Sequence, residues 1–487
     1  MNYSVILCMV VAIPFLGAGL ILLFGKYPNL RDGLSVIVAT ILFGTVYQLV
    51  EPLKQGSLTE VTLLEVTTGI SFGISVEPLG LMFALVASFL WIVTGLYAVG
   101  YMRGHHEENQ TRFFACFAVA IGGAMGVSFS SNLFTLFAFY ELLTLCTFPL
   151  VTHHGTNEAK KAGRVYLGIL LSTSVGLQLL AIVWTWNLAG TLDFVEGGIL
   201  SGTTSNTILS VLIALFVFGV GKAAVMPFHR WLPAAMVAPT PVSALLHAVA
   251  VVKVGVFTIL KVAIYIFGLS TLSELASTPW LRWVAATTII LGSLVAFTKN
   301  NLKARLAYST ISQLSYIVLA ALLANEYSII GGGMHIAMHA FGKITLFFAA
   351  GAVLVAAHKT DISDMRGLGR KMPLTFGAFF VGSLSIIGVP PAGGAWSKWF
   401  LGLGTLEADE PVLLAVLMVS SLLSLVYLLE VPVRAFFNTP EGDEGKGGIQ
   451  EAPWPCLVAM GISSGLTLGL FFFPNFLYEM MKMVFES

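Results

Sequence analysis

The feature that most constrains this chain is a series of long apolar segments, which recur from its first residues almost to its end. The chain of 487 residues is 57% hydrophobic and only 10% charged, with a mean hydropathy of +0.88. A soluble domain cannot hide that much apolar surface from water. The runs have the length of a spanning helix, about 20 residues, and lack the alternation of barrel strands. The sequence therefore predicts an all-α polytopic membrane protein.

Charge and cysteine content exclude two classes of function. The formal net charge is zero and no basic run exceeds two residues, so the chain has no electrostatic footprint for nucleic acid. The cysteines lie singly, at Cys8, Cys116, Cys146 and Cys456, without the spacing of a disulfide framework, a zinc site or an iron–sulfur cluster. We therefore expect no metal and no cofactor on this chain, and no redox or hydrolytic site of its own.

Fourteen spans are predicted from the apolar windows between clusters of turn residues and charges. They lie near residues 4–24, 32–50, 79–101, 112–130, 132–153, 161–186, 205–226, 241–267, 279–298, 303–323, 327–357, 372–390, 411–437 and 454–475. The seventh runs into Met226-Pro227, and the twelfth contains Pro390-Pro391 between glycines. Both are predicted to be broken helices, which at membrane depth usually line a cavity.

Basic residues are unevenly divided between the loops. Loops after odd-numbered spans hold seventeen lysines and arginines, and loops after even-numbered spans hold only Lys54 and Arg282. By the positive-inside rule the odd loops are cytoplasmic. The prediction is a multi-pass protein of the inner (plasma) membrane with both termini on the outer side.

The two predicted breaks lie five spans apart, and each has a lysine nearby, Lys222 and Lys398. An odd offset means that the two units run in opposite directions, as in the inverted repeats that place ion sites near the bilayer midplane. The predicted organisation is three N-terminal spans (1–111), a first five-helix repeat (112–267), a second, inverted repeat (279–437) and a last span (438–487).

Ionisable residues inside the predicted spans carry the functional argument. Each costs about 2.5–3.5 kcal/mol on insertion scales, so such groups tend to persist only when they are paired, hydrated or used. Glu141 is the one carboxylate near the middle of a span, and the lysines within spans are Lys222, Lys253, Lys261, Lys343 and Lys398. Desolvation and a movable carboxylate can shift a lysine between its charged and neutral forms. The pattern predicts proton transport, with Lys222 as the expected partner of Glu141.

Histidines extend this polar set. In the eleventh span His335, His339 and Lys343 fall at positions i, i+4 and i+8, on one helix face, which suits a proton relay. His247 in the eighth span is off the face of Lys253, and we expect it to bond to backbone freed near Pro241.

Two further charged residues of the spans have structural interpretations. Lys261 lies near the end of its span, where it could snorkel to the interface. Glu430 lies four residues before Arg434, as in a helix-surface pair.

Several motifs together resemble the antiporter-like subunits shared by Mrp-type cation/proton antiporters, respiratory complex I and membrane-bound hydrogenases. They include Tyr140-Glu141-Leu142, Gly221-Lys222-Ala223-Ala224, Trp231-Leu232-Pro233, Ala238 to His247, Val252-Lys253-Val254-Gly255, His339 to Lys343, and Ser397-Lys398 after Pro390-Pro391. The lysines at positions 253 and 398 look most like those of the Mrp D-type branch. The histidine at position 247 resembles one found in the larger A-type and complex I subunits. Ala234 departs from the acidic residue that many relatives carry after Trp-Leu-Pro.

The resemblance implies roles for these residues. Glu141 would pair with Lys222; Lys253 or His247 and His335 or His339 would continue a central polar axis; Lys398 would be its terminal site. It implies a proton-translocating subunit that works with other membrane subunits, carrying protons with or without sodium. Two alternatives remain open: a subunit driven by redox partners, as in complex I or a membrane-bound hydrogenase, and a proton-flow module that energises another process such as inorganic carbon uptake.

Overall fold

The computed structural model describes residues 3–56, 60–275, 278–439 and 448–486. Its helices are α1 (Tyr3–Leu23), α2 (Pro28–Tyr47), α3 (Val50–Lys54), α4 (Pro78–Gly104), α5 (Gln110–Ser128), α6 (Leu133–Val151), α7 (Asn157–Thr173), α8 (Leu179–Ala189), α9 (Asn206–Gly219), α10 (Trp231–Ala234), α11 (Thr240–Ala244), α12 (Val251–Val262), α13 (Leu269–Glu274), α14 (Thr278–Thr298), α15 (Leu302–Leu323), α16 (Glu326–Ala357), α17 (Pro373–Ile387), α18 (Gly394–Glu407), α19 (Pro411–Phe437), α20 (Trp454–Phe472) and α21 (Asn475–Lys482). Short π-helical turns join α7 to α8 and α11 to α12, which makes each pair one continuous helical segment.

Twelve described helical segments are long and apolar enough to cross a membrane. Two shorter apolar helices, α9 and α17, stand where the seventh and twelfth spans were predicted. Predicted and observed bounds differ by a few residues in most cases and coincide for α19. The predicted fold class, a helical polytopic membrane protein broken at these two places, is confirmed. The count of fourteen spans, the inverted repeats and the division into segments stay predictions.

Both breaks occur where the sequence changes from apolar residues to glycine and proline. Helix α9 ends at Gly219, and Lys222 lies in the 3₁₀ turn Gly221–Ala223 that follows. Helix α17 ends at Ile387, and the next residue, Gly388, has a φ of +88°, in the left-handed region that favours glycine. The chain resumes a helix at α18. Carbonyl groups at membrane depth are thereby released from helix hydrogen bonding and can serve buried polar side chains.

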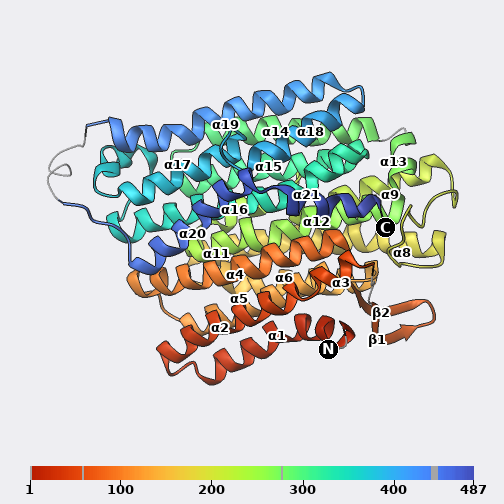
Figure 1. The fold of residues 1–487 in the computed structure, drawn as a ribbon, viewed down its shortest axis with the longest axis horizontal. Helices are drawn as coiled ribbons and strands as arrows, with labels where there is room; N and C mark the ends of the chain where they lie inside the picture. Colours follow the sequence, from red (N-terminus) through yellow and green to blue (C-terminus); the bar gives the residue numbers. More distant parts are fainter. Residues whose placement is uncertain (1–2, 57–59, 276–277, 440–447, 487) are drawn as a thin grey trace.

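One element was not predicted. The strands β1 (Glu60–Thr67) and β2 (Ile70–Ser75) form an antiparallel hairpin between α3 and α4. Figure 1 shows this hairpin extending from one end of the bundle, at the same end as the N-terminus. It is the only sheet among the described residues, and its end of the protein is called the hairpin side.

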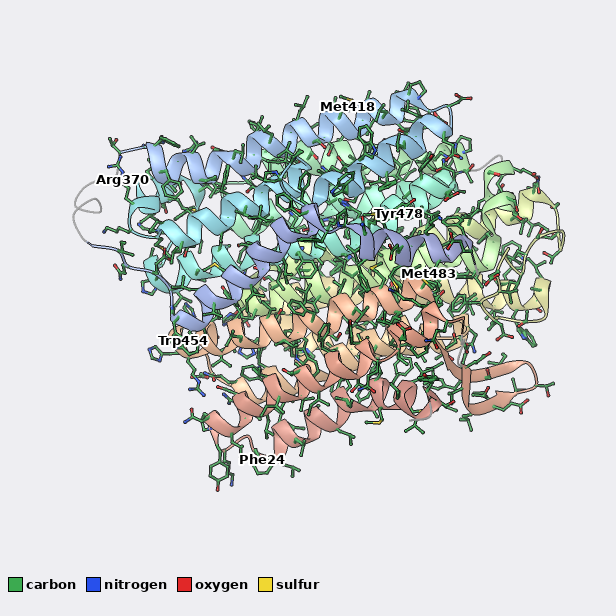
Figure 2. The ribbon with its side chains drawn as sticks, in the orientation of Figure 1. Phe24, Arg370, Met418, Trp454, Tyr478 and Met483 are labelled. Atoms are coloured by element: carbon green, nitrogen blue, oxygen red, sulfur yellow. The ribbon has the colours of Figure 1, made fainter. Side chains whose placement is uncertain are left out.

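The helices lie side by side, with α1 at one edge of the bundle and α19 at the opposite edge (Figure 1). Between them lie α4, α12 and α16; α12 is buried along its whole length, and α16 packs against α15, α17, α18 and α20. Figure 2 shows Phe24, Arg370 and Trp454 spread along the end opposite the hairpin. The interior helices are therefore the ones that carry most of the predicted ionisable residues.

Some basic residues counted as loop residues belong to helices instead. Arg282 lies in α14, donates to the Leu322 carbonyl and pairs with Glu410 at 3.4 Å. Arg31 lies in α2 and shares the buried Asp32 with Arg103. These side chains tie helices together, so their charges carry less information about orientation than loop charges do. The outer location of both termini stays a prediction.

Helix α16 begins with a capping box that also fixes its neighbour. The Asn325 side chain accepts from the Ser328 backbone N–H, the Ser328 hydroxyl accepts from the Asn325 backbone N–H, and the Asn325 amide donates to the Gly404 carbonyl in α18. A Cβ added at Gly404 would lie 2.7 Å from the Ser328 backbone nitrogen. The glycine therefore allows the backbones of α16 and α18 to touch.

This contact predicts that Gly404→Ala destabilises the protein. Alanine favours a helix over glycine by about 1 kcal/mol, but the forced separation of two packed backbones costs about 1–3 kcal/mol. The control is Gly461→Ala in α20, where nothing lies within 4 Å of the added Cβ. Thermal unfolding in detergent should show a lower midpoint for Gly404→Ala and an unchanged or higher one for Gly461→Ala; equal midpoints would contradict this packing account.

Candidate functional site

Lys222 is completely buried in the break after α9, and its ammonium is held by α6. Its Nζ donates to the Tyr140 carbonyl at 2.9 Å and to the Thr144 hydroxyl at 2.5 Å, and it lies 3.2 Å from the centre of the Tyr140 ring. The Lys222 backbone N–H donates to the Tyr140 hydroxyl. A buried ammonium is tolerated when hydrogen-bond acceptors and an aromatic face replace its water.

Glu141 does not form the expected ion pair with Lys222. No carboxylate contacts Lys222 among the described residues, and one Glu141 oxygen is buried without a hydrogen-bond partner. The reason is direction on the helix: Tyr140 and Thr144, four residues apart, present one face of α6 to Lys222, and Glu141 lies beside that face. Glu141 directly follows Tyr140, whose carbonyl accepts from the Lys222 ammonium. The predicted neighbourhood is therefore correct, while the predicted direct contact is wrong.

The tryptophan after the break stabilises the broken backbone. Trp231 is fully buried, and its indole N–H donates to the Gly221 carbonyl at 2.9 Å. Gly255 of α12 packs so closely on the turn that an added Cβ would meet the backbone of Lys222. The turn that carries Lys222 is thereby fixed between α6 and α12. Its contact residue on α12, Gly255, lies two residues after Lys253.

Lys253 and the eleventh-span histidines form a contiguous polar file in the protein's centre. Lys253 Nζ lies 2.7 Å from His339 Nδ1, the His339 and His335 rings are 5.6 Å apart, and His335 Nδ1 lies 2.9 Å from the Ser397 hydroxyl. All four residues are buried. Nε2 of each histidine has no hydrogen-bond partner within the described ranges. The predicted face of α16 is confirmed, and it connects α12 to α18.

Lys343 and His247 contribute less direct contacts. The Lys343 ammonium donates to the Leu306 carbonyl of α15 at 3.2 Å, one helical turn beyond His339. His247 lies in the π-helical turn before α12, and both of its ring nitrogens lack a hydrogen-bond partner in the described chain. Its ring packs on Phe347 instead, at 4.6 Å between ring centres. The expected bond from His247 to freed backbone is therefore wrong.

Lys398 repeats the arrangement of Lys222 at the second break. Its Nζ donates to the carbonyls of Ile386 and Ile387, at 2.8 and 3.1 Å, and to the Ser421 hydroxyl at 2.9 Å. The last carbonyls of a helix carry partial negative charge and favour a cation there. A cavity of about 290 Å³, lined also by Met418 of α19, reaches Lys398. Figure 2 places Met418 at the outer edge of the bundle, so this end of the polar set opens laterally.

Sequence reasoning missed the partner of Lys261. Instead of snorkelling to the interface, Lys261 is fully buried and pairs with Glu77 at 2.7 Å, while it also donates to the Ser130 carbonyl. Glu77 directly precedes α4 and looks in the sequence like an ordinary loop carboxylate. A signal was available in the position of Glu77 just before an apolar span, but no local pattern connects it to a lysine 184 residues away.

A histidine cluster at the opposite end was also missed. Glu107 lies 3.0 Å from His105 Nδ1, 3.8 Å from His153 Nε2 and 3.7 Å from His154 Nδ1. Burial lowers the pKa of the His153 imidazole, and the Glu107 carboxylate acts in the opposite direction. Glu430, by contrast, pairs with Arg434 as predicted and also with Arg305 of α15. Neither cluster is hydrogen-bonded to Lys253, His339 or His335 among the contacts of the described residues.

These features define a class: a polytopic membrane protein whose interior carries buried lysines and histidines that connect two broken helices. Comparison with known proteins places it further. The family described as NADH:quinone oxidoreductase/Mrp antiporter, TM matches residues 130–424, and the family of the N-terminus of chain 5 of NADH-ubiquinone oxidoreductase (complex I) matches residues 65–114. The chain belongs to this family of antiporter-like, proton-translocating membrane subunits.

Individual relatives show the same affiliation. NADH-quinone oxidoreductase subunit N of Desulforudis audaxviator is 34% identical over 388 residues, which cover 78% of this chain and 75% of the relative. NAD(P)H-quinone oxidoreductase chain 5 of a Picosynechococcus species is 31% identical over 80% of this chain, but only 59% of the relative is covered. A chain in the structure of the Mrp complex from a Dietzia species has the same fold, with a TM-score of 0.88, 22% identity and coverage of 99% and 97%.

The hold of α6 on Lys222 leads to a stability prediction. Thr144→Val keeps the shape of the side chain but leaves the ammonium one acceptor short, at a cost of about 1–3 kcal/mol. In a Lys222→Met background the same change should cost much less, because no ammonium remains. Thermal unfolding of the four proteins measures this coupling. Thr152→Val is the control, because its hydroxyl donates only to the Phe148 carbonyl of its own helix; a coupling no larger than that control's would contradict the assignment.

Proposed function

We propose that this chain is the proton-translocating subunit of a multi-subunit cation/proton antiporter of Mrp type, similar to the D-type subunit. The observation that supports it most is the buried polar file from Lys253 to Ser397, the residue before Lys398. Hydrogen bonds join Lys253 to His339 and His335 to Ser397, and the two histidine rings are in contact between them. A chain of an Mrp complex has the same fold over 99% of this chain and 97% of its own length, which agrees with the proposal in size and fold. The proposal assigns transport roles to Glu141, Lys222, Lys253, His335, His339, Lys343 and Lys398, with His247 beside them.

The chemistry of the file explains how a proton would move. Lys253 Nζ and His339 Nδ1 share one hydrogen bond, so only one of them can supply its proton. Two cations at that distance in a water-poor interior repel strongly. A proton on Lys253 therefore disfavours one on His339, and its passage to His339 leaves Lys253 neutral. His335 and Ser397 then offer the next acceptors toward α18.

Glu141 acts in this proposal as the electrostatic control of Lys222. Glu141 makes no direct contact with Lys222 within the described ranges, but it lies beside the carbonyl of Tyr140 and the hydroxyl of Thr144 on α6 that accept from the Lys222 ammonium. A change in the charge of Glu141 therefore alters the energy of the Lys222 ammonium without breaking its hydrogen bonds. Such a group can load or release a proton in response to a neighbouring subunit.

A second candidate is a redox-driven role, as a proton-pumping subunit of a complex I-type oxidoreductase or a membrane-bound hydrogenase. The identity with NADH-quinone oxidoreductase subunit N favours it. Co-purification distinguishes the two: iron–sulfur or quinone-reactive subunits bound to the chain support the redox-driven role, and an assembly of membrane subunits alone supports the antiporter. Sodium-dependent proton movement in vesicles of that assembly then tests whether sodium is the exchanged cation.

The transport proposal predicts that Glu141→Gln and Lys222→Met each reduce proton transport by at least about tenfold, because each removes a charge that the proton path requires. The assembled complex should still form. Dye-detected proton uptake in membrane vesicles provides the measurement.

Matched controls are Glu158→Gln and Lys160→Met, which change exposed residues at the start of α7. Both should transport at the unmodified rate. Normal transport by either Glu141→Gln or Lys222→Met would contradict the proposed function.

A further inference from the structure

The buried pair of Lys261 and Glu77 lines a cavity on the hairpin side. The cavity has a volume of about 480 Å³ and includes Glu60, Ser75, Asp193 and Glu196 in its lining together with the pair itself. The side chain of Lys261 is 1% exposed and that of Glu77 is 13% exposed, so the carboxylate is the more accessible partner. The proposed transport file does not use either residue.

Helix α12 connects this pair to the central lysine. Lys253, Phe257 and Lys261 fall at positions i, i+4 and i+8, so they lie on one face of the helix, and about 12 Å of helix rise separates the two lysines. The Lys261 ammonium lies 5.6 Å from the centre of the Phe257 ring. Phe257 is therefore the side chain between the central file and the buried ion pair.

A second phenylalanine completes this barrier. The ring of Phe83 in α4 lies 5.1 Å from the ring of Phe257, and both side chains are fully buried. Helix α4 also follows directly from Glu77, so the same two helices, α4 and α12, supply the ion pair and both aromatic rings. Two buried aromatic rings in contact exclude water and interrupt proton transfer between polar groups on their two sides.

We propose that Glu77 and Lys261 form the proton exit of this subunit on the hairpin side, and that Phe257 and Phe83 form the gate between this exit and Lys253. This inference rests on the proposed function, since it names the route by which a proton leaves the central file. When the rings part and water enters between them, this water relays a proton from the Lys253 ammonium to the Glu77 carboxylate, which leaves a neutral amine and a carboxylic acid. Glu77 then releases the proton into the cavity, and the Lys261 ammonium favours its return to the carboxylate form.

The test is passive proton flux through the purified full-length chain in liposomes, driven by a potassium diffusion potential and followed with an entrapped pH dye. Phe257→Ala should raise the flux by about tenfold, because it opens the gate, whereas Phe257→Leu, which keeps an apolar side chain there, should not. Phe113→Ala is the matched control, since Phe113 of α5 is equally buried and meets Phe114 edge to face, with the ring centres 5.1 Å apart. Phe113 is not part of the proposed route.

Second substitutions, added to Phe257→Ala, test which residues the proton passes. Glu77→Gln or Lys253→Met added to Phe257→Ala should each return the flux to the unmodified value, and Lys261→Arg, which keeps the ion pair, should leave it high. Phe83→Ala, in α4, should open the same gate. It replaces Phe257→Ala in the test if that variant does not fold. No increase with either folded variant overturns the gate.

The two proposals fail differently. If the raised proton flux of Phe257→Ala is abolished by Glu77→Gln but not by Lys253→Met, Glu77 and Lys261 are not the outlet of the central file, and the exit proposal is overturned. Normal proton transport by Glu141→Gln or by Lys222→Met overturns the proposed function itself, whatever the gate variants do.

Discussion

The constraint on which this structure depends is the cost of a lysine ammonium inside a membrane. Such a group needs acceptors where helices have already used their own carbonyls. The protein meets the need by breaking two helices: the break after α9 positions Lys222 against a carbonyl and a hydroxyl of α6, and the break after α17 frees two carbonyls for Lys398. For Lys222 and Lys398 the helix break and the charge are therefore one feature, and the lysines of α12 and α16 lie between the two breaks with other partners.

The sequence was sufficient for the features that depend on local pattern. Apolar run length located the spans, and glycine and proline located both breaks, because helix formation and its interruption are decided by residues close together in the chain. The i, i+4, i+8 spacing placed His335, His339 and Lys343 on one face, where the structure has them. The hairpin was missed because β1 and β2 lie between two spans, in a segment interpreted only as a connection.

Contacts between distant segments could not be predicted in the same way. The choice of Tyr140 and Thr144, and not Glu141, as direct ligands of Lys222 depends on the rotation of α6 about its axis. The pairing of Lys261 with Glu77 joins α12 to the residue just before α4. The environment of His247 depends on a π-helical turn. Each is fixed by tertiary packing, which a pattern of single residues does not specify.

The central claim is that Lys253 carries the transported proton, and does not simply place a fixed positive charge beside His339. Proton transport by Lys253→Arg tests it most directly, because arginine keeps the charge and the donors but does not lose its proton in a protein. The account predicts that Lys253→Arg transports no better than Lys253→Met, while Lys160→Arg at the exposed end of α7 transports normally. Transport by Lys253→Arg at the unmodified rate would contradict the account.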